Sequence, residues 1–168
     1  MGLTGDASRH LLMDPAFWRP RLERLEREPR KLAVFPRPDL SRPGIDVVEL
    51  RLSAHDGARL TALLARSAFA ETGLVVRLRA CVDPGNASLD FSAVEEGGTD
   101  LVFHYPPDRR LEDRVLDVLR IVHAACSVEN IDCSKVSFLP SDSCVQDEFS
   151  IVRFLREMGL LGNHPSSG

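Results

Sequence analysis

Residues 135–149, KVSFLPSDSCVQDEF, contain an apolar run, a turn and the start of a helix. The run KVSFL is typical of a buried strand. Ser143 followed three residues later by Gln146 matches a capping box, in which a serine side chain begins a helix. A strand, a turn and a helix in this order can expose a nucleophilic side chain at the start of the helix. Asp142, Ser143 and Cys144 are therefore the candidate nucleophiles of the chain.

Strand-like patterns precede this stretch. Residues 46–52, DVVELRL, alternate apolar and polar side chains, and HDG at 55–57 is a strong hairpin signal before a second strand-like run at 58–65. The runs at 73–78 and 99–104 are continuously apolar, which is typical of buried parallel strands. An antiparallel hairpin is therefore expected first, followed by parallel strands.

Helical patterns lie between and after these strands. A helix is expected to open at Asp108, and a second helix is expected to follow the turn and to end at Gly159. The first has one apolar face and carries most of its charges elsewhere. Its apolar face contains Leu111, Val115, Leu119 and Val122, and its charged residues are Arg109, Glu112, Asp113 and Asp117. The fold class predicted is α/β, with an N-terminal antiparallel hairpin and then parallel strands alternating with helices.

Four segments are expected along the chain. Residues 1–12 are predicted to form a loose leader, and Asp14 followed by Pro15 predicts a helix start within an N-terminal segment, 13–45. The prolines between 29 and 44 predict an extended connector in place of a folded element. Residues 46–160 form the main domain, and 161–168 a flexible tail.

Composition excludes several classes of function. The net charge of −4 gives no basic field for nucleic acid. No apolar run is long enough to cross a membrane, and the first residues lack the pattern of a signal peptide, so a cytoplasmic location is expected. The spacings of the cysteines match no zinc pattern, so reduced thiols and no metal or cofactor are expected. The cysteines are Cys81, Cys126, Cys133 and Cys144.

The order of these patterns resembles the N-terminal half of the acetyl xylan esterase and cephalosporin-C deacetylase branch of the α/β-hydrolases. DPAFWRPRLERLEREP is similar to the family's opening helix with its F-W pair, and VVELRLSAHDGARLTALLA to its strand, S-x-D-G turn and strand. LEDRVLDVLRIVHAACSVENIDCSKVSFLPSDS looks like the long helix and the strand before the nucleophile elbow. The resemblance covers residues 14–158 and implies the fold of a carboxylic-ester hydrolase.

The chain departs from this family where the family's chemistry lies. The elbow motif G-x-S-x-G falls on residues 140–144, so Asp142 takes the nucleophile position and both glycines are missing. Arg79 and Ala80 stand where the family has the His-Gly of its oxyanion loop. The triad histidine should follow the nucleophile along the chain, and His164 in the tail is the only histidine there. Catalysis is therefore not carried over residue by residue.

Individual residues have competing interpretations. Ser143 is predicted to be a helix cap first and a nucleophile second. Cys144 is predicted to be a buried structural thiol first. Its alternative is a reactive thiol in a first helical turn, where the helix dipole lowers the pKa of a thiol, with His104 or His123 as partner. Arg79, His104 and Tyr105 are candidates for lining a ligand pocket, because open α/β sheets bind ligands at the carboxyl ends of strands. The adjacent residues Arg109 and Arg110 are expected to form ordinary surface ion pairs, with binding of an anion as the alternative.

The sequence therefore predicts a truncated, non-catalytic α/β-hydrolase-like domain with a structural or protein-binding role. A sheet edge at or near KVSFL is expected to pair with a second copy of the chain or with a partner protein. The alternative is a carboxylic-ester hydrolase whose triad is completed in trans or uses Ser143 or Cys144. A small-ligand or redox-sensing module that uses exposed thiols is a third class.

Overall fold

The computed structural model describes residues 10–28, 31–67, 75–76, 78–80, 94, 99–104, 109–129, 137–138 and 146–161. Its helices are α2 (Pro15–Arg27), α4 (Leu111–Glu129) and α5 (Gln146–Glu157). Its strands are β1 (Ala33–Pro36), β2 (Ile45–Ser53), β3 (Arg59–Ser67), β4 (Val75–Val76), β5 (Leu78–Ala80), β6 (Thr99–His104) and β7 (Ser137–Phe138). The mixed α/β class expected from the sequence is confirmed.

A five-stranded sheet has the order β1-β2-β3-β6-β5, and β4 pairs with β7 in a separate two-stranded ladder. The pairs β1–β2, β2–β3 and β3–β6 are antiparallel, so the predicted hairpin is confirmed. The run at 99–104 was expected to be a parallel strand. Instead β6 pairs antiparallel with β3 along its whole length, and its parallel partner β5 is short. Antiparallel pairing therefore dominates the described sheet.

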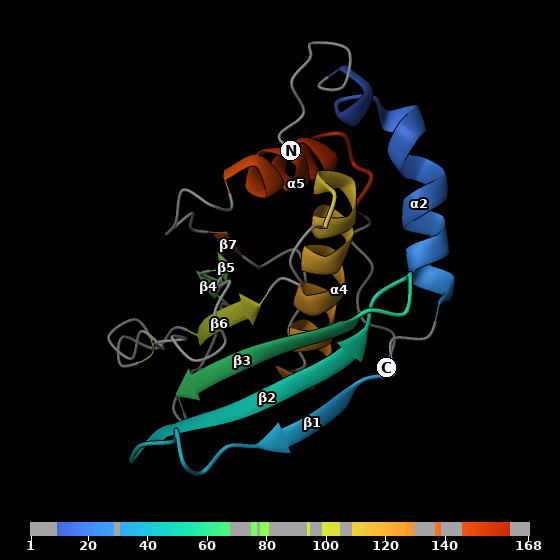
Figure 1. Ribbon diagram of the computed structural model, residues 1–168. Helices are drawn as coiled ribbons and strands as arrows, with labels where there is room; N and C mark the ends of the chain where they lie inside the picture. Colours follow the sequence, from blue (N-terminus) through green and yellow to red (C-terminus); the bar gives the residue numbers. More distant parts are fainter. Residues whose placement is uncertain are drawn as a thin grey trace.

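All three helices lie on one side of this sheet, where α4 packs on β2 and β3 and both α2 and α5 pack against α4 (Figure 1). Alternate residues of β2, β3 and β6 point toward the helices, as the strand period of two requires. The core so formed contains, among others, Leu50, Leu52, Leu60, Leu64, Leu101 and Phe103 from the strands and Trp18, Leu22, Val115, Leu119 and Leu155 from the helices. The helical face of the sheet is thus the main hydrophobic core.

Helix α2 begins as the sequence predicts. The side chain of Asp14 accepts a hydrogen bond from the backbone N–H of Ala16 at 3.0 Å, and Pro15 occupies the first turn, where no N–H is needed. Pro20 lies inside the helix without splitting it. The loose leader expected over residues 1–12 is too long at its end, because residues 10–12 form a helical turn. Leu12 within that turn is buried, and its carbonyl accepts a hydrogen bond from Trp18 Nε1 at 2.8 Å.

The expectation that the proline-rich segment holds no folded element is wrong, because β1 lies within it and pairs with β2. Contacts on the sheet face opposite the helices hold β1 in place. There Glu49 of β2 is buried and bonds to Arg37, just after β1, at 2.7 Å, and to Arg51 at 2.5 Å. Arg51 also lies over the ring of Phe35, with 4.5 Å to the ring centroid. Ion pairing and a cation–π contact therefore help to hold a strand whose own residues are all exposed.

Helix α4 begins three residues later than expected. The backbone N–H of Arg114 donates to the carbonyl of Arg110 at 2.9 Å, so Arg110 precedes the first helical residue. Asp117 and Arg120 of this helix are fully buried, although a polar face was expected for Asp117. Arg120 donates from Nε to the carbonyl of Ser53 at 2.9 Å. Because α2, α5 and the sheet all pack against it, α4 has little solvent-exposed face.

Candidate functional site

The carboxyl ends of several strands meet at one edge of the sheet. Register places Ala80 of β5 beside Phe103 of β6, and His104 at the end of β6 beside Thr61 near the start of β3. The β2–β3 turn therefore lies at the same edge as the ends of β5 and β6. Open α/β sheets bind ligands beyond the carboxyl ends of their strands. This edge is thus the candidate site.

Of the residues predicted to line a pocket, Arg79 and His104 lie in strands that end at this edge. Arg79 is in β5 opposite Val102, and His104 is the last residue of β6, but their side chains lie outside what the structure describes. Tyr105 lies wholly outside the described residues. Their role in lining a pocket stays a prediction.

The elbow segment falls between two described elements. Strand β7 ends at Phe138 and α5 begins at Gln146, so Asp142, Ser143 and Cys144 all lie outside the described residues. An ion pair between Glu148 Oε1 in the first turn of α5 and Arg114 Nε, at 3.1 Å, joins α5 to α4. The order strand, segment, helix is present, whereas the identity of a nucleophile stays a prediction.

The β2–β3 turn brings a histidine to the edge. The backbone N–H of Ala54 donates to the carbonyl of Ala58 at 2.7 Å, and Gly57 takes a φ of +86°, which favours glycine. This turn places His55 Nε2 3.1 Å from Asp113 Oδ1 in the first turn of α4. The other ring nitrogen, Nδ1, is buried and has no hydrogen-bond partner within the described part of the chain. His55 and Asp113 therefore connect the hairpin to α4.

A buried ion-pair network lies next to this contact. Arg109 Nε and Nη2 donate to the two carboxylate oxygens of Asp117 at 3.0 and 2.8 Å, and Arg109 Nη1 also donates to Asp56 of the turn. The side chains of Arg109 and Asp117 are 8% and 0% exposed. The expectation of an ordinary surface pair is wrong for Arg109, whereas exposed Arg110 does form one, with Glu112 at 3.8 Å.

Burial and pairing act in opposite directions on the pKa values of this network. Burial raises the pKa of Asp117 to about 6, although the hydrogen bonds from Arg109 oppose the shift. Burial alone would lower the pKa of Arg109, but its hydrogen bonds to Asp117 and Asp56 outweigh this and hold it above the ordinary value. The network therefore keeps a strongly held cation beside a carboxyl group that titrates near neutral pH.

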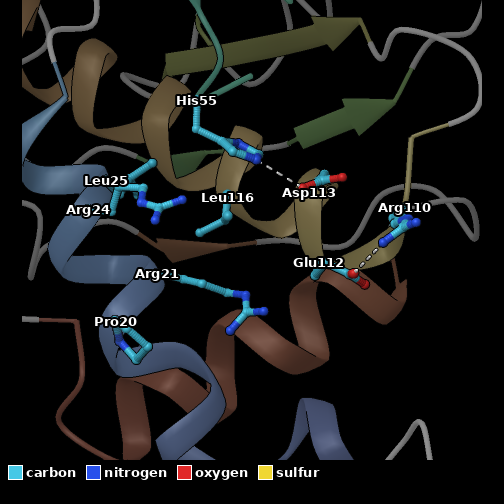
Figure 2. Close-up of a pocket in the computed structure, with 9 residues that line it drawn as sticks. All are labelled: Pro20, Arg21, Arg24, Leu25, His55, Arg110, Glu112, Asp113 and Leu116. Carbon is cyan, nitrogen blue, oxygen red and sulfur yellow. Dashed lines mark ion pairs between the residues drawn. The ribbon is translucent and has the colours of Figure 1, made fainter. Parts of the chain in front are cut away.

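A pocket of about 360 Å³ opens beside the histidine, between α2, the β2–β3 turn and the start of α4 (Figure 2). Its lining is apolar on one part and charged on the rest. The residues are Pro20, Arg21, Arg24, Leu25, His55, Arg110, Glu112, Asp113 and Leu116. Figure 2 shows the side chains of α2 and α4 converging on the space between the two helices.

Sequence reasoning missed these residues because each had a simpler interpretation. HDG predicts a turn, which the structure confirms, but the turn signal does not indicate that His55 faces α4. Asp117 stands within the apolar run VLDVL, and a charge flanked on both sides by apolar side chains is the signal that was available. Buried charges are normally paired, so this position predicts a cationic partner. The partner's identity depends on the fold.

Other candidate chemistries have limited support in the described residues. There, no group of three or more histidine, cysteine, aspartate or glutamate side chains is arranged to hold a metal ion. The side chain of Cys126 is buried, and the remaining cysteines lie outside the described residues. His123, a predicted partner of Cys144, is half-buried in α4. None of the described helices combines the length and the apolar character that a membrane span needs.

Comparison with known proteins shows a likeness in structure alone. No protein-family model and no curated protein matches the chain. An acetyl xylan esterase from Paenibacillus sp. R4 matches with a TM-score of 0.58 at 14% identity, over 74% of this chain and 50% of its own. Acetyl xylan esterase 1 from Thermoanaerobacterium sp. JW/SL YS485 matches with a TM-score of 0.66 at 10% identity, over 83% and 53%.

A glucuronoyl esterase from Solibacter usitatus matches with a TM-score of 0.52 at 10% identity, over 82% of this chain and 56% of its own. The chain therefore spans about half the length of the esterases that it matches. At such low identity the likeness concerns the fold. This chain therefore shares the fold of about half of each of these esterases.

Proposed function

We propose that this chain is a non-catalytic domain with an α/β-hydrolase-like sheet, and that it acts by binding a second copy of itself along β7. The observation that carries the proposal is that, within the described residues, β7 is paired along one side only. One side of this strand pairs with β4, and no strand among the described residues pairs with its other side. A strand with unpaired backbone groups is a template for another strand.

Two further observations support a binding role over catalysis. The positions that match the elbow motif lack both glycines and have Asp142 as the nucleophile, and Arg79 replaces the histidine of the oxyanion loop. The matched esterases are about twice as long as the part they share with this chain, so in them further chain accompanies that part. In this proposal a second copy takes that place.

Association through β7 is tested by sedimentation equilibrium on the purified chain and on the variants Ser137→Pro and Phe138→Pro. Successive N–H groups of a strand point to opposite sides, so one of these prolines removes an outward donor and the other a donor to β4. We expect a wild-type dimer. The proline on the outward side should give a monomer with an unchanged thermal unfolding midpoint.

Val34→Lys, at an exposed position of β1, an edge strand of the five-stranded sheet, is the control and should stay dimeric. A wild-type chain that sediments as a monomer at every concentration would contradict the proposal. So would a dimer that survives both prolines while β7 is retained.

Ester hydrolysis is the second candidate function, and the fold of the matched esterases favours it. The segment with Asp142, Ser143 and Cys144 connects β7 to α5, as a nucleophile elbow would. The base would come from a second chain, or Cys144 would act as a thiolate. This candidate predicts turnover of p-nitrophenyl acetate.

The hydrolysis test compares wild type with Asp142→Ala, Ser143→Ala and Cys144→Ala, and uses Ser127→Ala at an exposed position of α4 as control. Substitution of a true nucleophile should lower the turnover rate of the protein about 100-fold or more, because most of the rate depends on the activated nucleophile. Absence of turnover above buffer would reject the hydrolase and agree with the binding role. Turnover that survives all three substitutions would mean a contaminating activity.

A further inference from the structure

We propose that the pocket between α2, the β2–β3 turn and α4 binds a small amphipathic organic anion, with an apolar ring or chain and a single carboxylate, sulfonate or phosphate group. The pocket holds about 360 Å³, within the range of about 300–1,000 Å³ that is typical of small-molecule sites. None of its lining residues belongs to β7 or to the elbow segment. The inference is therefore independent of the proposed function.

The apolar part of the lining fits the apolar part of such a ligand. Leu25 of α2 and Leu116 of α4 contribute side chains that belong to the main core, and Pro20 adds an apolar ring on the α2 side (Figure 2). These three groups lie on the two helices that face one another. Burying a ring or chain against them removes apolar surface from water.

Among the side chains that line the pocket, cationic groups outnumber carboxylates that are free to pair with them. Its two carboxylates are already paired, because Asp113 contacts His55 at 3.1 Å and Glu112 contacts Arg110 at 3.8 Å. That leaves the two arginines of α2 without a carboxylate partner among the residues that the structure describes.

The two arginines are placed to hold one anion together. Arg21 and Arg24 lie three residues apart, so they occupy the same face of α2, where like charges repel. Arg21 Nη1 donates to the carbonyl of Phe17 at 2.6 Å, and its guanidinium lies 3.6 Å from the centroid of the Phe17 ring. These contacts hold the cation in place. An anion between the guanidinium groups would relieve the repulsion and gain charge-assisted hydrogen bonds.

The proposal is tested with the fluorescent anion 1-anilinonaphthalene-8-sulfonate and its uncharged parent, N-phenyl-1-naphthylamine. We expect saturable binding of the sulfonate to wild type and weaker binding of the parent compound. Removal of both charges in Arg21→Gln/Arg24→Gln should weaken sulfonate binding at least about tenfold, because two charge-assisted contacts are lost. Binding of the uncharged probe should change little.

Arg19→Gln/Arg27→Gln is the matched control, since both residues are exposed on the same helix and line no part of the pocket. It should bind the sulfonate as wild type does, and Arg21→Lys/Arg24→Lys should retain most of the binding because it keeps the charge. Circular dichroism and thermal unfolding check that every variant is folded. Equal sulfonate binding by the pocket and control variants, or equal affinity for both probes, would overturn the proposal.

Discussion

Replacing Arg109 with methionine is expected to lower the free energy of unfolding by about 3–5 kcal/mol at pH 7. The reason is that Asp117, with a fully buried side chain, would lose the partner that donates two hydrogen bonds to its carboxylate. A buried charge without a partner is among the costliest defects in a fold. Urea unfolding followed by circular dichroism measures the loss.

The same substitution should be less damaging at pH 5 than at pH 7. The pKa of Asp117 is about 6 in the folded chain, above its ordinary value of 3.8, because of burial. Such a group favours the fold most below its unfolded pKa and loses that contribution as the pH rises through the folded pKa. Without Arg109 the folded pKa should rise further, so at pH 5 the carboxyl is neutral and needs no partner.

Two variants separate this mechanism from a general loss of packing. Arg110→Met removes a neighbouring guanidinium that is 80% exposed, and it should change the free energy of unfolding by less than about 0.5 kcal/mol. Arg109→Met/Asp117→Leu removes both buried charges and should recover much of the stability. A loss for Arg109→Met that is equal at pH 5 and pH 7 would show that the charge of Asp117 is not its cause.

Trp18→Ala is expected to cost about 3–5 kcal/mol of unfolding free energy, as large-to-small changes of buried aromatic residues do. Trp18 is 0% exposed and fills the contact between α2 and the core. Its indole N–H donates to the carbonyl of Leu12 at 2.8 Å, which ties the turn at residues 10–12 to the helix. Trp18 thus packs α2 against the core and also holds the turn that precedes the helix.

The packing and hydrogen-bonding roles of Trp18 can be separated by unfolding measurements. Trp18→Phe keeps most of the apolar surface and removes the N–H, so it should cost less than the alanine variant but at least about 1 kcal/mol, because a buried carbonyl loses its donor. Arg19→Ala, at the next and exposed position, should be nearly neutral. A Trp18→Ala chain as stable as Arg19→Ala would show that α2 is not docked by this residue.

The features that the sequence predicts well are those with a local cause. The cap at Asp14, the turn at 55–57 and the stop at Gly159, which has a φ of +70°, each depend on a few adjacent residues. The pattern of apolar residues likewise locates the hairpin strands and the two later helices. Such signals do not require knowledge of which elements meet in space.

The features that the sequence misses depend on contacts between distant segments. Strand β1 is held by Glu49, which lies on another strand, and proline content alone predicts a connector there. His55 and Asp113 are far apart in the chain, as are Asp56 and Arg109, and their pairing follows from how the hairpin meets α4. The elbow prediction concerns residues outside the described part and stays a prediction.

The short edge strand β1 limits how many copies of this chain can join. Its last residue, Pro36, has no backbone N–H, and proline within a sheet is confined to places where a donor is not needed, so this edge is poorly suited to accept another strand. A chain with two receptive edges adds copies without end and gives a fibre. Association through a single edge, as proposed for β7, stops at a closed two-fold pair.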